Sequence, residues 1–118
     1  MRILNIFNKK ENMNVDFSMI NSNEKAEKLL EKGQLEKLYL KPIQFGGKES
    51  RENIVIVPRF VTISKNNFDN IVEELLKKGI VSDYSAEPQY KGNSYVPTSI
   101  VISVSGKTRL TQVLEIWK

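Results

Sequence analysis

Two carboxylates in the second half of the chain have a spacing that could hold a metal ion. Asp83 and Glu87 fall on one side of a predicted strand, with Ser85 between them. All three side chains supply the oxygen ligands that Ca²⁺ and Mg²⁺ prefer. Two carboxylates are an incomplete cage for either ion, however, and the same alternation is typical of a solvent-facing strand side. We favour the solvent-facing side and predict no metal ligand.

The absence of two residue types excludes several kinds of catalysis. The 118-residue chain has no histidine and no cysteine. Ser–His and Cys–His relays are therefore impossible, and so are the usual zinc sites. We predict no catalytic residue and no cofactor, and we expect a non-enzyme. The least favoured alternative is an enzyme that works with carboxylates or a tyrosine.

A glycine-rich loop at residues 45–48, Phe-Gly-Gly-Lys, resembles part of a phosphate-binding loop. Its backbone amides could meet an anion. It lacks the Gly-x4-Gly-Lys-Ser/Thr spacing of a P-loop, and it joins two predicted strands instead of opening a helix. We therefore favour a plain turn.

Lysines and tyrosines recur together in two parts of the chain, as on surfaces that bind single-stranded nucleic acid. The net charge of +4 is spread along the sequence, and the acidic Asp83 and Glu87 would repel phosphate. Nucleic-acid binding is therefore the alternative function and not the preferred one. Its candidate contacts are Lys37, Lys41, Lys48, Lys91 and Tyr95.

These side chains would be positioned by an internal repeat. Residues 15–57 match residues 61–103 at a constant offset of 46, with thirteen identities in 43 pairs and no gap. Identical residues include the pairs Gly33/Gly79 and Pro42/Pro88, which fall where helix ends and turns are expected. Coincidence between two similar helix–strand segments is the alternative.

Each repeat is predicted to form a strand, a helix and two further strands. Alternation favours strands at residues 13–19 and 61–64, and Ser18 and Ser64 are expected to cap the helices that follow. Gly33 and Gly79 are expected to end these helices, and Pro42 and Pro88 the strands after them. The remaining strands are expected at residues 35–41, 53–57, 81–87 and 99–104. The second helix has an apolar stripe at Phe68, Ile71, Val72, Leu75 and Leu76.

A final strand at residues 109–117 lies outside the repeat. A three-residue loop before it would pair Val104 with Leu110 and Ile100 with Leu114, whereas a two-residue loop would pair Val104 with Arg109. We favour the three-residue loop because it gathers the large aliphatic residues on one face. Trp117 would then lie on the opposite face.

The predicted fold is α+β: one mixed or antiparallel sheet with two helices on one face, in a single domain of residues 1–118. Residues 1–12 form either a flexible segment or one apolar turn, and no segment is long enough to span a membrane. We expect a cytoplasmic, non-catalytic protein-interaction domain, one form of which is a neutralising, immunity-type binder of another protein. A homodimer is a further option. The expected partner surface is Tyr39, Val101, Val113 and Trp117.

Overall fold

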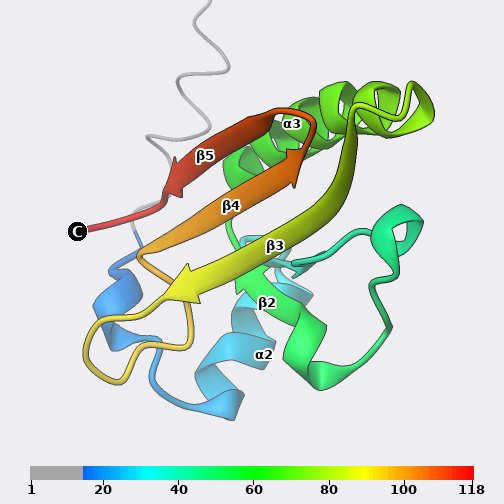
Figure 1. The fold of residues 1–118 in the computed structure, drawn as a ribbon. Coiled ribbons are helices and arrows are strands. Elements are labelled where there is room, and N and C mark those ends of the chain that lie inside the picture. Colours follow the sequence, from blue (N-terminus) through cyan, green and yellow to red (C-terminus); the bar gives the residue numbers. More distant parts are fainter. Residues whose placement is uncertain (1–14) are drawn as a thin grey trace, which may run out of the picture.

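The computed structural model describes residues 15–118, and its architecture confirms the α+β class (Figure 1). Residues 1–12 and the start of the first predicted strand lie outside the described residues, so the predictions for them are not tested. In chain order, the helices and strands are η1 (Phe17–Met19), α2 (Asn23–Glu31), β1 (Glu36–Tyr39), η2 (Ile43–Phe45), η3 (Arg51–Asn53), β2 (Ile54–Val57), α3 (Arg59–Lys77), β3 (Val81–Gln89), β4 (Ser99–Gly106) and β5 (Arg109–Glu115).

The strands form two antiparallel sheets instead of the single sheet expected. β1 pairs with β2, and β3, β4 and β5 form a separate three-stranded sheet in that order. Figure 1 shows α3 packed behind the three-stranded sheet, with β2 and α2 on the β3 side of it. Because α3 contacts β1 as well as β3 and β5, it joins the two sheets into one core.

The predicted register of β5 is confirmed. Val104 lies opposite Leu110 and Ile100 opposite Leu114. Ile100, Ile102 and Val104 are fully buried, so the inward face of β4 carries the aliphatic residues whose burial favoured this register.

Two predicted strands are helical. Residues 61–64 belong to α3, which begins directly after Pro58, and Ser64 lies inside the helix instead of capping it. The short alternation there fits a helix equally well, because Val61, Lys65 and Val72 continue one buried face backward from the predicted stripe. Ile71, predicted inside that stripe, lies at its flank and is 60% exposed.

The first predicted strand is also replaced, over its described part, by a turn of 3-10 helix. Asp16 accepts a hydrogen bond from the backbone nitrogen of Ser18 and closes the turn. The N-cap of α2 is then Ser22, whose hydroxyl accepts from the Lys25 nitrogen. Asp and Ser side chains compete for nearby amides in this way, so local capping outweighs a short apolar alternation.

The predicted helix ends are confirmed. Gly33 and Gly79 have φ values of +75° and +73°, the left-handed conformation that glycine adopts without strain. The Gly33 nitrogen donates to Leu30 and the Gly79 nitrogen donates to Leu76, the matching position in the second repeat. The strand registers do not follow the offset, since Leu38 faces Val55 while Tyr84 faces Val104.

Of the two strands predicted to stop at a proline, the second does not stop there. β3 continues through Pro88, which lies opposite Ile100 on β4. β3 is an edge strand of its sheet, and an edge strand tolerates the missing N–H of proline because one side of its backbone is unpaired. No helix within residues 15–118 is long and apolar enough to cross a membrane.

Candidate functional site

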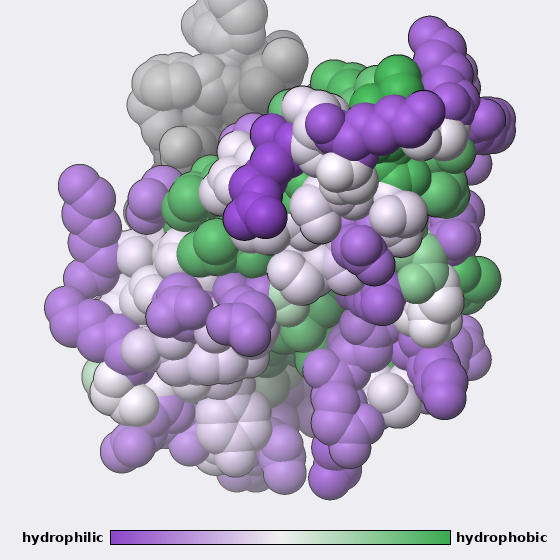
Figure 2. Space-filling model, viewed as in Figure 1, coloured by the Kyte–Doolittle hydropathy of each residue, from purple (hydrophilic) through white to green (hydrophobic). Residues whose placement is uncertain are grey.

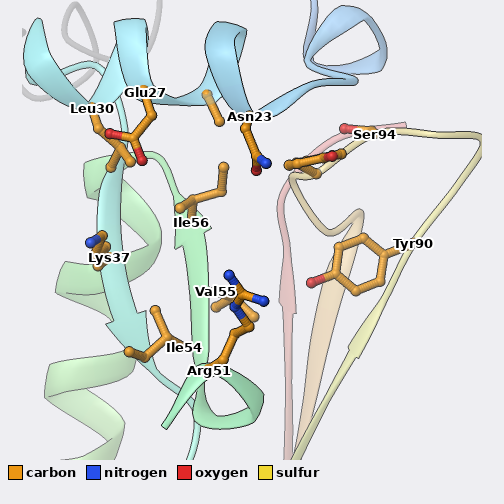
Figure 3. Close-up of a pocket in the computed structure, with 12 residues that line it drawn as sticks. Asn23, Glu27, Leu30, Lys37, Arg51, Ile54, Val55, Ile56, Tyr90 and Ser94 are labelled. Carbon is orange, nitrogen blue, oxygen red and sulfur yellow. The ribbon is translucent and has the colours of Figure 1, made fainter. Parts of the chain in front are cut away.

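A cleft of about 590 Å³ lies between the β1–β2 sheet and the connection from β3 to β4 (Figure 3). Helix α2 closes one end of it, and Figure 3 shows Tyr90 pointing across the open space toward β2. The residues that line the cleft are Asn23, Ala26, Glu27, Leu30, Lys37, Arg51, Ile54, Val55, Ile56, Tyr90, Ser94 and Tyr95. These residues come from four separate segments of the chain.

The floor of the cleft is apolar. Ala26 is buried and Leu30 half-buried on α2, and Ile54 and Ile56 of β2 are half-buried. Tyr90 and Tyr95 form the opposite wall and keep 50% and 40% of their surface exposed. Burial raises the pKa of the Tyr90 phenol above its usual value of 10.0. A tyrosine hydroxyl is protonated at neutral pH and can donate a hydrogen bond.

Buried hydrogen bonds hold the tyrosine wall in place. The Ser94 hydroxyl, in a residue that is 6% exposed, donates to the Phe17 carbonyl at 2.6 Å and accepts from the Val96 nitrogen at 3.1 Å. The backbone nitrogen of Tyr95 donates to the Ile20 carbonyl at 2.7 Å. The turn that replaced the first predicted strand therefore anchors the wall of the cleft.

The rim of the cleft carries two cations and one carboxylate. Lys37 and Arg51 form no salt bridge within residues 15–118, and neither does Glu27. The two cations lie on the β-sheet side of the cleft, and Glu27 lies on α2 (Figure 3). The side next to β2 therefore carries two cations that form no salt bridge in the described part of the chain. The exposed Glu52 lies beside Arg51, and hydrogen bonds from its own backbone and from Ser50, together with the charge of Arg51, lower its pKa.

A second cluster is a buried ion pair that the sequence reasoning missed. Lys65 is 2% exposed, and its Nζ lies 2.7 Å from Oδ2 of Asp69. The Tyr84 hydroxyl donates to Oδ1 of Asp69 at 2.5 Å, and the Lys65 ammonium lies 5.4 Å from the centre of the Tyr84 ring. Burial lowers the pKa of Lys65 despite Asp69, and burial together with the hydrogen bond to Asp69 raises the pKa of Tyr84.

This cluster adjoins a hollow of about 330 Å³ between β1, η2 and α3. In the sequence, the feature that indicates the buried ion pair is the position of Lys65. Its spacing from Val61, Phe68 and Val72 places it in the apolar stripe of a helix that starts early enough. A lysine at such a position is rarely buried unless it is paired, and Asp69 stands four residues on.

The structure divides the predicted partner surface among three places. Val101 and Val113 lie opposite one another on the outward face of the three-stranded sheet, and Val113 is 43% exposed. Trp117 follows β5, packs against the core and donates its indole N–H to the Val96 carbonyl at 3.0 Å. Tyr39 belongs to the other sheet, where its hydroxyl donates to Glu49 at 2.6 Å.

The predicted anion contacts do not form one patch either. Lys37 and Tyr95 line the cleft. Lys41 lies with Arg109 in a different hollow, and the Lys91 ammonium donates to the carbonyl of the last residue, Lys118, at 3.1 Å. The backbone carbonyl of Lys48 accepts from the Asn53 amide at 2.9 Å, in the loop where Gly46 adopts a φ of +91°.

Asp83 and Glu87, the two carboxylates with a possible metal-binding spacing, are exposed on β3. Asp83 pairs with Ser105 and Glu87 with Val101. Within residues 15–118, no three histidine, cysteine or acidic side chains gather in a way that could hold a metal ion.

Comparison with known proteins assigns no role to these sites. The chain matches no protein-family model, and no curated protein is similar to it.

Proposed function

We propose that this chain is a non-catalytic protein-interaction domain, and that the cleft beside β2 is its binding site. The observation that carries the proposal is the combination of an apolar floor, two partly exposed tyrosines and an arginine without a salt bridge in the described chain. Tyrosine and arginine around an apolar centre are the residues that contribute most energy at protein interfaces.

The mixed surface of the molecule supports a localised site (Figure 2). The face drawn there is mostly hydrophilic, with green apolar areas confined to separate patches. A pocket that receives one or two anchoring side chains can supply affinity without a large flat apolar surface. The cleft meets that need because its tyrosines come from a connection held in place by Ser94.

Site-specific cross-linking tests the proposal. A photo-crosslinking phenylalanine analogue in place of Tyr90 is expected to capture one protein from the cells that make this chain. The same analogue in place of Val113 is the matched control, because Val113 is similarly exposed on the outward face of the other sheet. We expect at least about tenfold more product from position 90, and its yield should persist after nuclease treatment and at high salt.

The opposite pattern would locate the interface elsewhere. A product from position 113 and none from position 90 would place binding on the surface around Val101 and Val113. The absence of a protein product from either position would contradict the proposed function.

Binding of single-stranded nucleic acid is the second candidate function. It is favoured by the presence of Lys37, Arg51, Tyr90 and Tyr95 in one cleft, since stacking tyrosines beside cations can hold unpaired bases. If this function holds, a fluorescent oligothymidine should bind with log K falling against log salt at a slope of about −1.4, because two cations neutralise two phosphates. Anisotropy titration measures the slope, and Arg51→Gln should halve it. Lack of binding at low salt would reject this candidate.

A further inference from the structure

We propose that the partner supplies an extended, acidic segment that adds as a new strand to the free edge of β2 inside the cleft. This inference rests on the proposed function and names the form of its ligand. An exposed sheet edge binds an extended peptide through main-chain hydrogen bonds, while side pockets select its side chains.

The cleft runs along the edge of β2 and does not merely cover one face of the strand. Ile54, Val55 and Ile56 all line it. Successive strand residues point to opposite faces, so a cavity lined by Ile54, Ile56 and the buried Val55 reaches the backbone of β2 as well as the face that carries Ile54 and Ile56. Figure 3 shows β1 on one side of β2 and the open cleft on the other.

The register identifies which backbone groups face the cleft. The Leu40 nitrogen donates to the Asn53 carbonyl, and Leu38 lies opposite Val55. In an antiparallel pair, positions that bond the partner strand alternate with positions that point away. Val55 therefore bonds to β1, and the N–H and C=O groups of Ile54 and Ile56 point away from it.

One of these four groups is already used. The Ile54 nitrogen donates to the Arg51 carbonyl. The Ile54 carbonyl and both backbone groups of Ile56 bond to no other backbone segment within residues 15–118. An incoming strand would thus gain a paired donor and acceptor at Ile56 and an acceptor at Ile54, the arrangement that a sheet edge offers to another chain.

The charges beside this edge argue for an acidic segment. Arg51 begins η3, the turn that leads into β2, and Lys37 lies opposite Ile56 on β1. Both are on the sheet side of the cleft and form no salt bridge in the described chain. An acidic side chain on the added strand near Ile54 would meet Arg51, and a guanidinium can bind a carboxylate through two parallel hydrogen bonds. Apolar side chains of the same segment would reach Leu30, Tyr90 and Tyr95.

A displayed library of random dodecapeptides, selected on the full-length chain, provides the probe. We expect the enriched peptides to combine a carboxylate with β-branched or aromatic residues and to contain no proline at their centre. Amide hydrogen exchange, followed residue by residue by NMR, then tests the geometry. Bound peptide should slow exchange at Ile56 at least about tenfold, while Val55, already bonded to β1, should change little.

Variants separate the backbone contribution from the charge. Ile56→Pro removes the outward N–H without removing a bond to β1, and it should weaken peptide binding by about tenfold. Arg51→Gln should weaken acidic peptides, whereas Arg109→Gln, outside the cleft, is the matched control and should not. If Ile56→Pro does not fold, exchange at Ile56 in the unsubstituted chain still decides the question.

Three outcomes would overturn strand addition. Peptides that bind in the cleft without protecting Ile56 would reject it and leave the proposed function standing. Protection of Ile56 that grows with protein concentration and needs no peptide would show that a second copy of this chain occupies the edge. Failure to select any peptide that perturbs the cleft would reject strand addition, and the Tyr90 cross-link would decide separately whether the cleft binds a folded protein surface.

Discussion

Replacing Asp69 with alanine is expected to lower the free energy of unfolding by about 3 kcal/mol. The change leaves the ammonium of Lys65, which is 2% exposed, without its carboxylate, and it removes the acceptor of the Tyr84 hydroxyl. Breaking one side of a buried ion pair costs about 3–5 kcal/mol. The lower end applies because the Asp69 side chain is 18% exposed and water reaches part of the site. Equilibrium denaturation in urea measures the loss.

The pH dependence of this variant has a definite sign. Asp69 raises the pKa of Lys65, while burial lowers it below 10.5. Without Asp69, the folded-state pKa falls further, so between that pKa and 10.5 the unfolded chain binds more protons than the folded chain. Stability therefore rises with pH over that interval. The deficit of Asp69→Ala relative to the unsubstituted protein should shrink as the pH is raised toward 10.

A double variant provides the control. Lys65→Met with Asp69→Asn removes both charges, keeps the side-chain volumes similar and leaves an oxygen that can accept from Tyr84. Replacing a whole buried pair is often close to neutral, so the double variant should be at least about 2 kcal/mol more stable than Asp69→Ala. A loss below about 1 kcal/mol for Asp69→Ala would show that water screens the pair.

Replacing Ile100 with alanine is expected to cost about 2–5 kcal/mol, the usual range for deleting most of a large side chain from a packed core. Ile100 is fully buried on β4, between Pro88 of β3 and Leu114 of β5. Its neighbours belong to a three-stranded sheet backed by α3, so they cannot readily collapse into the space. Denaturation in guanidinium chloride measures the loss.

The matched control is Val113→Ala on the outward face of the same sheet. Val113 is 43% exposed, and exposed substitutions usually change stability by less than about 0.5 kcal/mol. Equal losses at Ile100 and Val113 would contradict the register, because a shift of one residue exchanges the two faces of a strand.

Features that depend on near neighbours in the chain could be predicted from the amino-acid sequence. Gly33 and Gly79 end their helices because only glycine enters the left-handed region without strain. The pairing of Val104 with Leu110 followed from alternation across a short loop. Both signals involve residues a few positions apart, where backbone geometry leaves few alternatives.

Short alternating patterns, by contrast, were ambiguous because they contain too few residues to define a period. Residues 61–64 alternate as a strand does, yet they form the first turns of α3. Four residues do not distinguish a period of two from a period of 3.6. The helix was predicted to begin after Ser64, whereas α3 begins at Arg59. With the later start, the predicted apolar stripe did not include Lys65, so its pairing with Asp69 was not predicted.

The division of the strands into two sheets and the position of the cleft depend on long-range packing. Whether β2 continues into the larger sheet or keeps a free edge depends on how α3, α2 and the β3–β4 connection pack together. The cleft joins Lys37, Ile56 and Tyr90 from segments whose distance in sequence carries no information about distance in space. Long-range packing sets that distance, and the alternation or spacing within a single segment does not encode it.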